Sequence, residues 1–115
     1  MDIDIINSLS KLDLFEKFKT QLNRDFELCG LLDYSPKLVS NHIEHVLDEV
    51  LNAVILIEKK DTSSIQNLLY RIDITENQIK REFHDNSEKN FQQILAQLII
   101  KRVLQKIILK QKYSN

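Results

Sequence analysis

The sequence is poor in the residues that interrupt regular secondary structure. Its 115 residues include one glycine, one proline, one cysteine and no tryptophan. Tight turns between β-strands depend on glycine and proline, so their scarcity argues against a sheet with several hairpins. The hydrophobic fraction of 43% and the charged fraction of 29% are those of an ordinary globular protein. We therefore expect an all-α fold, with residues 1–115 forming a single small helical bundle.

The lone cysteine and the apolar runs bear on where the protein resides. Cys29 alone can form neither an intramolecular disulfide nor a cysteine-built zinc site, which fits a reducing compartment. The N-terminus, Met-Asp-Ile-Asp-Ile, is acidic where a secretion signal is basic. Residues 50–57 form the longest uncharged apolar run in the middle of the chain, and it is too short to cross a bilayer. These features predict a cytoplasmic protein that does not enter a membrane.

Apolar spacing and helix-end signals predict four or five helices. Their ranges are residues 8–29, 36–60, 62–70, 75–85 and 87–113, so the first, second and last are long. Gly30 is placed to end the first helix. Pro36 after Ser35 is placed to begin the second. Thr75 and Gln78 have the spacing of a capping box that opens the fourth. The last two helices are expected either as separate helices or as one kinked helix.

The segment 91–109 contains no glycine, proline or acidic residue, and its apolar side chains occupy more than one face. At about 100° per residue they form two groups on nearly opposite sides. One group is Phe91, Ile94, Leu95 and Leu98, and the other is Ile100, Val103, Leu104 and Ile107. A helix that is apolar almost all round is one that other helices surround.

Two interpretations follow for the second apolar group. Either the bundle covers it, with Arg102 and Lys106 reaching solvent, or it meets a second copy of the chain. Because the helices expected at 62–70 and 75–85 are short, we expect one chain to leave this side uncovered. The sequence thus predicts a homodimer whose contacts are Ile100, Val103, Leu104, Ile107 and Ile108.

Residues 64–84 follow the apolar spacing of a helix-turn-helix and suggest a DNA-binding regulator as the alternative function. The side chains free to contact nucleic acid would be Asn77, Gln78, Lys80, Arg81 and His84. Leu69 and Asp73 fit this motif poorly, because a small residue and a glycine are usual there. The net charge of −1 also lacks the basic footprint of a DNA binder. An ordinary helical hairpin explains much of the same pattern.

A third possibility is a metal-binding bundle. His42, His45 and Glu49 lie within one helical arc, and histidine with glutamate four residues later is a spacing used by metal sites in bundles. His84 is the only other histidine, and Asp48 shows that the arc falls on the polar side of its helix. A solvated face with an ordinary histidine–glutamate pair accounts for the three residues without a metal.

No glycine-rich phosphate loop, nucleophile motif or specific metal signature is present. Cys29 falls on the apolar stripe of Phe15, Phe18, Leu22 and Phe26, with no basic residue spaced to lower its pKa, so we expect a buried structural thiol. The sequence therefore favours a non-enzymatic interaction or regulatory module without a cofactor, self-associating through its C-terminal helix.

Overall fold

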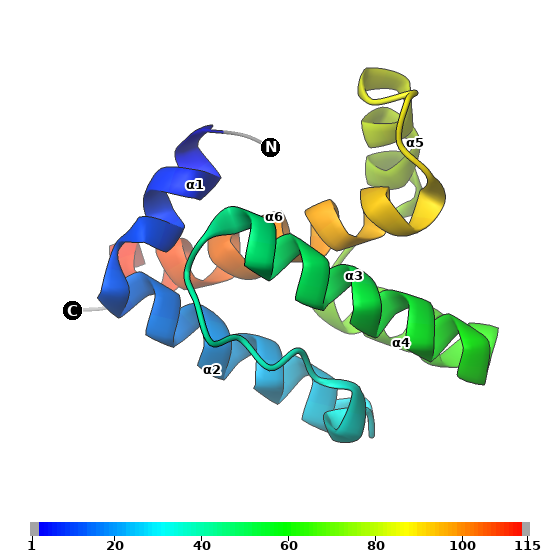
Figure 1. Ribbon diagram of the computed structural model, residues 1–115, viewed down its shortest axis with the longest axis horizontal. Coiled ribbons are helices and arrows are strands. Elements are labelled where there is room, and N and C mark those ends of the chain that lie inside the picture. The colour runs from blue at the N-terminus through cyan, green and yellow to red at the C-terminus, as the bar shows by residue number, and fades with distance from the viewer. Residues whose placement is uncertain (1–2, 114–115) are drawn as a thin grey trace.

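Six α-helices and one short 3-10 helix follow one another along residues 3–113, the part of the chain that the computed structural model describes (Figure 1). They are α1 (Ile3–Ser10), α2 (Leu12–Leu28), η1 (Leu32–Tyr34), α3 (Ile43–Lys60), α4 (Thr62–Ile72), α5 (Glu76–Asp85) and α6 (Phe91–Tyr113). The all-α prediction is confirmed, but the predicted count of four to five helices is too low. The additional helix is α1, which lies mostly before the first expected helix (residues 8–29) and is separated from α2 by the extended backbone of Lys11.

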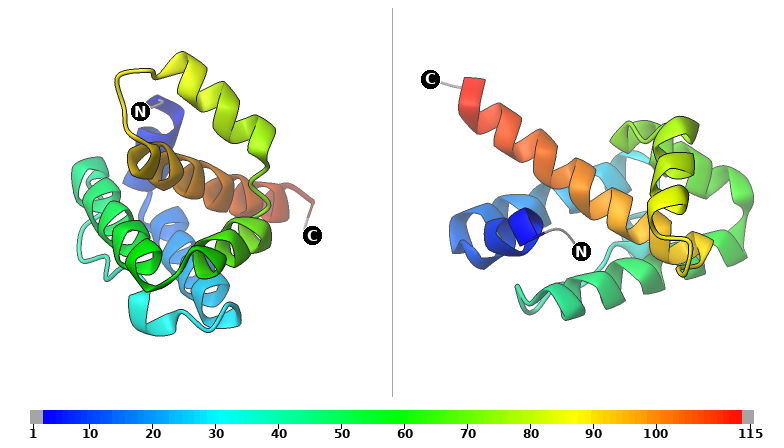
Figure 2. Two further views of the ribbon diagram at one scale, coloured as in Figure 1. Left: turned by 90° about the vertical axis from the view of Figure 1, so that its right-hand side faces the viewer. Right: turned by 90° about the horizontal axis from the view of Figure 1, so that it is seen from above.

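The C-terminal helix α6 is the centre of the bundle. It has 23 residues, a length of about 35 Å. All five other α-helices pack against it: α3 and α2 most extensively, with α4, α5 and α1 completing the ring (Figures 1 and 2). Its seven consecutive residues from Ile94 to Ile100 are buried, including the polar Gln97. The prediction that other helices surround this segment is therefore confirmed.

The expectation that one chain would leave the second apolar side of α6 uncovered is wrong. Val103 is 0% exposed and Ile107 is 4% exposed within the single chain. The cover over this half of the helix comes from α2 and from α1, the helix that apolar spacing did not predict. Ile5 and Leu9 of α1 are themselves buried. Helix α1, most of which precedes the first expected helix, thus supplies the surface that the short helices lack.

The segment 35–42 also differs from the prediction, since it is not helical and α3 begins only at Ile43. Figure 1 shows this segment running back along α2 before α3 begins. An extended chain covers roughly twice the distance per residue that a helix does, and the return path needs that reach. Pro36 is buried, and the side-chain amide of Asn41 donates a hydrogen bond to the carbonyl oxygen of Leu9 (3.1 Å). Tertiary contacts therefore override the local helix-start signal.

Local end signals elsewhere act as the sequence suggests. Gly30 has φ +70° and follows the last turn of α2. Thr75 and Gln78 form both hydrogen bonds of the predicted capping box at the start of α5. The start of α6 is a correction, because the expected cap, Ser87, lies in a turn. Asn90 occupies the cap position, exchanging hydrogen bonds of 2.9 and 3.0 Å with Gln93.

The cap of α4 is the carboxylate of Asp61, which links helix stability to pH. One carboxylate oxygen accepts the backbone N–H of Ser64 (2.6 Å) and the hydroxyl of Ser63 (3.0 Å). These bonds, the backbone bond from Ser64 foremost, hold the pKa of Asp61 below its ordinary value. A carboxyl group whose pKa is lower in the folded chain stabilises the fold above its unfolded pKa, about 3.9. That stabilisation is lost as the pH falls through the folded pKa.

We expect Asp61→Asn to lower the stability at neutral pH by a small amount that disappears in acid. Asparagine keeps an oxygen acceptor at the cap position but removes the charge that Ser64 and the helix N-terminus favour. The urea midpoints of the two proteins should differ at neutral pH and converge as the pH falls below about 3.9. A difference that stayed constant across this range would show that the carboxylate charge contributes nothing at the cap.

Candidate docking cleft

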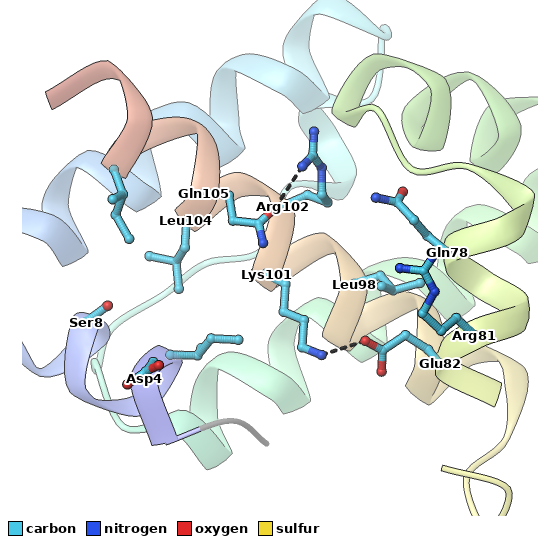
Figure 3. Close-up of a pocket in the computed structure, with 12 residues that line it drawn as sticks. Asp4, Ser8, Gln78, Arg81, Glu82, Leu98, Lys101, Arg102, Leu104 and Gln105 are labelled. Atoms are coloured by element: carbon cyan, nitrogen blue, oxygen red, sulfur yellow. Dashed lines mark hydrogen bonds and ion pairs between the residues drawn. The ribbon is translucent and has the colours of Figure 1, made fainter. Parts of the chain in front are cut away.

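A cleft of about 400 Å³ lies on the side of α6 where α1 and α5 face each other (Figure 3). Its floor is α6, its wall toward the N-terminus is α1, and its opposite wall is α5. The residues that line it are Leu98, Lys101, Arg102, Leu104, Gln105 and Ile108 of α6, Asp4, Ile5 and Ser8 of α1, and Gln78, Arg81 and Glu82 of α5. We call this the docking cleft.

The floor of the docking cleft is one stripe of α6. Leu98, Lys101, Gln105 and Ile108 recur every three or four residues, which places them on one face of the helix. Leu98 is 4% exposed, whereas Ile108 is 41% exposed. The strip left between α1 and α5 therefore has apolar ends and a polar middle, and it extends over roughly 15 Å.

Charges of both signs line the docking cleft, and most of them are paired. The Lys101 ammonium and the Glu82 carboxylate form a half-buried ion pair at 2.5 Å (Figure 3). Arg102 donates to Gln105 (2.8 Å) and to Asp73 (3.0 Å). Its Nε atom is buried and lacks a hydrogen-bond partner among residues 3–113.

Arg81 is the exception to this pairing. Its side chain is exposed, lines the cleft from α5, and makes no hydrogen bond or ion pair with any residue of the described chain. It is therefore a guanidinium with its full set of donors available to a ligand. The lining carries three basic groups, from Arg81, Lys101 and Arg102, and two acidic groups, from Asp4 and Glu82.

The groups in the docking cleft are suited to binding. Ser8 supplies the only hydroxyl of its described lining, and no histidine or cysteine stands beside it. The one carboxylate that α5 contributes to the described lining, from Glu82, is engaged by Lys101. A floor with apolar ends and a polar middle, flanked by a free guanidinium, is the kind of surface that holds an amphipathic, acidic group.

The predicted self-association residues mostly lie inside the chain. The exposed fractions of Ile100, Val103, Leu104 and Ile107 are between 0 and 4%. In the folded chain these four side chains are therefore unavailable to a second copy. Ile108 alone remains at the surface, at the edge of the docking cleft. The homodimer itself stays a prediction, but its proposed contacts need a different surface.

The turn of the predicted helix-turn-helix is present, but the two helices that flank it, α4 and α5, do not pack against each other. Asp73 adopts the left-handed backbone conformation (φ 71°), which ends α4 before α5 begins. However, α5 packs against α6, while α4 lies among α2, α3 and α6 (Figure 2, left). The side chain of Gln78 is used in the capping box. Asn77, Lys80, Arg81 and His84 are exposed on α5.

The three metal candidates are not brought together as ligands. His42 lies at the N-cap position, before the first turn of α3, with an exposed side chain. The Nε2 atom of His45 accepts the backbone N–H of Val39 (3.1 Å). Within residues 3–113 no three histidine, cysteine, aspartate or glutamate side chains gather closely enough to hold a metal ion.

A buried charge cluster escaped the sequence analysis. Asp25 of α2 is 0% exposed, and its carboxylate lies 3.5 Å from Arg71 Nε on α4 and 3.4 Å from Lys106 Nζ on α6. Gln21 donates to the same carboxylate (3.1 Å). The signal was a carboxylate on the apolar stripe of α2, three residues after Leu22. A charge at such a position needs partners from other helices.

Cys29 lies beside this charge cluster and is only partly buried. Its thiol donates to the carbonyl oxygen of Asn67 (3.7 Å). Burial raises the pKa of Cys29; Asp25 also raises it, whereas the charges of Arg71 and Lys106 lower it. The sequence predicts no basic residue spaced to lower the pKa of this thiol, but the folded chain brings Arg71 and Lys106 close enough to do so. The net direction is still upward, which disfavours the reactive thiolate.

Within residues 3–113 no helix is both long enough and apolar enough to cross a membrane. Comparison of the chain with models of protein families, with curated proteins and with solved structures finds no match. The assignment of function therefore depends on the geometry of the chain itself.

Proposed function

We propose that this protein is a non-enzymatic α-helical interaction module that holds an acidic, amphipathic helix of a partner protein in the docking cleft. The observation that carries the proposal is the strip of α6 between α1 and α5. On this strip a helix otherwise enclosed by its own chain presents both apolar and cationic side chains to a cleft that also holds the unpaired Arg81.

The shape of the strip favours a helical ligand. Lys101, Gln105 and Ile108 lie along roughly 10 Å of α6, which is about two helical turns. A partner helix of similar length would place residues at i, i+3 or i+4, and i+7 against these side chains, as helix-in-groove complexes do. The walls α1 and α5 would then flank the bound helix, completing the ring of helices around α6.

The charges favour an acidic ligand. Arg81 has no partner in the described chain, so a carboxylate of the ligand would form a new charge-assisted hydrogen bond without breaking an existing one. Lys101 lies next to it on the floor and is already partly neutralised by Glu82. A basic ligand helix would meet an uncompensated repulsion from Arg81.

We expect helical peptides selected from a displayed library against the folded chain to be amphipathic and acidic. Arg81→Glu should raise their Kd at least about tenfold, because it replaces a charge-assisted contact with repulsion. Lys80→Glu is a matched control, since it makes the same charge change one residue away on an exposed position that faces another groove. It should change the Kd by less than about twofold.

Two outcomes would remove the docking cleft as the binding site. The first is a set of selected helices that binds the wild-type chain and the Arg81→Glu variant equally well. The second is the enrichment of no helical peptide while the chain remains folded by circular dichroism. Both variants carry their substitution on exposed side chains of α5 that have no partner in the described chain, so neither should perturb the fold.

DNA recognition by α5 remains the second candidate, favoured by the exposed Asn77, Lys80, Arg81 and His84 on that helix. DNA binding and helix binding in the docking cleft predict different effects for the same two variants. Retention on heparin would weaken steeply with salt and would fall for Lys80→Glu as much as for Arg81→Glu, because phosphate contacts are not confined to one face of the cleft.

A further inference from the structure

A second groove, of about 480 Å³, lies between α4, α5 and the first turn of α6, away from the docking cleft. Its apolar lining comes from Leu69, Tyr70, Ile74, Ile79 and Phe91. Tyr70 is 88% exposed and Phe91 is 40% exposed. We call this surface the aromatic groove.

The aromatic groove is built on an ordered base. Phe83 of α5 stacks on Phe91 of α6 with ring centroids 5.9 Å apart. Leu69 and Ile74, which form the end of α4 and the following turn, are less than 10% exposed. Exposed aromatic side chains on such a base are characteristic of protein interfaces, because a large area is buried there at little cost in side-chain freedom.

Two opposite charges lie on one edge of the aromatic groove. Glu76 and Lys80 are one turn apart on α5, with Ile79 between them, and all three line the groove. Neither charge makes an ion pair or hydrogen bond with another residue in the described part of the chain. This edge is complementary to itself: if a second α5 lay antiparallel to the first, each Glu76 would face the Lys80 of the other helix.

We propose that the aromatic groove is the surface on which a second copy of this chain docks, about a two-fold axis close to Ile79. The two α5 helices lie antiparallel, with reciprocal Glu76–Lys80 ion pairs on either side of the axis. Tyr70 and Phe91 of each copy cover the apolar side chains of the other. This interface uses none of the buried residues of α6, and it is independent of the docking cleft on the opposite side of α5.

The test is the mass of the full chain by sedimentation equilibrium over a series of concentrations. The wild-type mass should rise from 13.6 kDa toward twice that value. Glu76→Lys and Lys80→Glu should each raise the dimer Kd at least about tenfold, because each places like charges opposite one another. The double variant Glu76→Lys/Lys80→Glu exchanges both charges, recreates the reciprocal pairs and should restore a Kd close to that of the wild type.

The variant Tyr70→Ala tests the apolar part of the proposed dimer interface, as the charge exchange tests its ion pairs. Since this side chain is 88% exposed, its removal leaves the core intact, and it should weaken the dimer by about tenfold. Arg81→Glu should leave the mass unchanged, which separates this proposal from the one about the docking cleft. A folded chain that stays monomeric at every concentration would overturn the proposal. A dimer that the double variant fails to restore would overturn it as well.

Discussion

Val103→Glu is expected to unfold most of the chain. Val103 is 0% exposed and lies on α6, against which every other α-helix packs. An unpaired carboxylate at such a position costs several kcal/mol, while a domain of this size is stable by only about 5–15 kcal/mol. The far-UV circular dichroism signal should fall, and the remaining folded fraction should unfold at a much lower urea concentration than the wild type.

Leu109→Glu is the matched control for this experiment. It makes the same kind of change six residues along α6, at a side chain that is 51% exposed, and should cost less than about 1 kcal/mol. The comparison also tests the original interpretation of α6 as a subunit interface. If Val103→Glu gave a folded monomer from a wild-type dimer, this half of α6 would be a contact between copies, contrary to its burial in one chain.

Lys106→Met is expected to destabilise the chain by about 2–3 kcal/mol, the second large effect. The substitution keeps the packing of the side-chain stem but removes the ammonium group that faces Asp25 at 3.4 Å. The carboxylate of Asp25 is 0% exposed, so it cannot turn to water for compensation. Arg71 and Gln21 remain as its partners, which keeps the loss below the full cost of an isolated buried charge.

Removing the carboxylate of Asp25 should cost less stability than removing the ammonium group of Lys106, because the two cations can reach solvent and the carboxylate cannot. The side chains of Lys106 and Arg71 are 24% and 45% exposed. We expect Asp25→Leu to lower the free energy of unfolding by about 1 kcal/mol. The double variant Asp25→Leu/Lys106→Met should lose about the same amount, so the effects of the two single substitutions should be strongly non-additive. Urea unfolding of the four proteins measures this coupling. A cost of Asp25→Leu larger than that of Lys106→Met would contradict the proposed asymmetry.

The exposed Lys110 provides a baseline for these measurements. It lies one turn beyond Lys106 on α6, and its ammonium donates a hydrogen bond to the side chain of Gln21 (3.2 Å) at the edge of the charge cluster. Lys110→Met should therefore change the free energy of unfolding by less than about 0.5 kcal/mol.

The residues of the docking cleft could be foreseen only in part. The sequence predicts Arg81 as an exposed cation of its helix, available to nucleic acid, and the structure places it at the surface. Lys101 and Gln105 are two of the polar residues that interrupt the apolar sequence of α6, and these interruptions are visible in the sequence. That they face a cleft depends on α1, whose position over α6 follows from a bend at Lys11 that apolar spacing does not specify.

The sequence by itself determined what depends on neighbours within one or two helical turns. The all-α class, the end of α2 just before Gly30, the capping box of Thr75 and the burial of α6 follow from local hydrogen bonds and from the spacing of apolar side chains. These interactions involve residues close in sequence, so a pattern of letters contains them.

Only the tertiary structure decided what depends on residues far apart in the chain. The extended path of residues 35–42, the partners of Asp25 and the cover over Val103 each require segments separated by many residues to meet. The physical reason is that burial and ion pairing depend on which surfaces come together in space, and apolar spacing specifies only that a face is covered. It does not specify which segment of the chain covers that face.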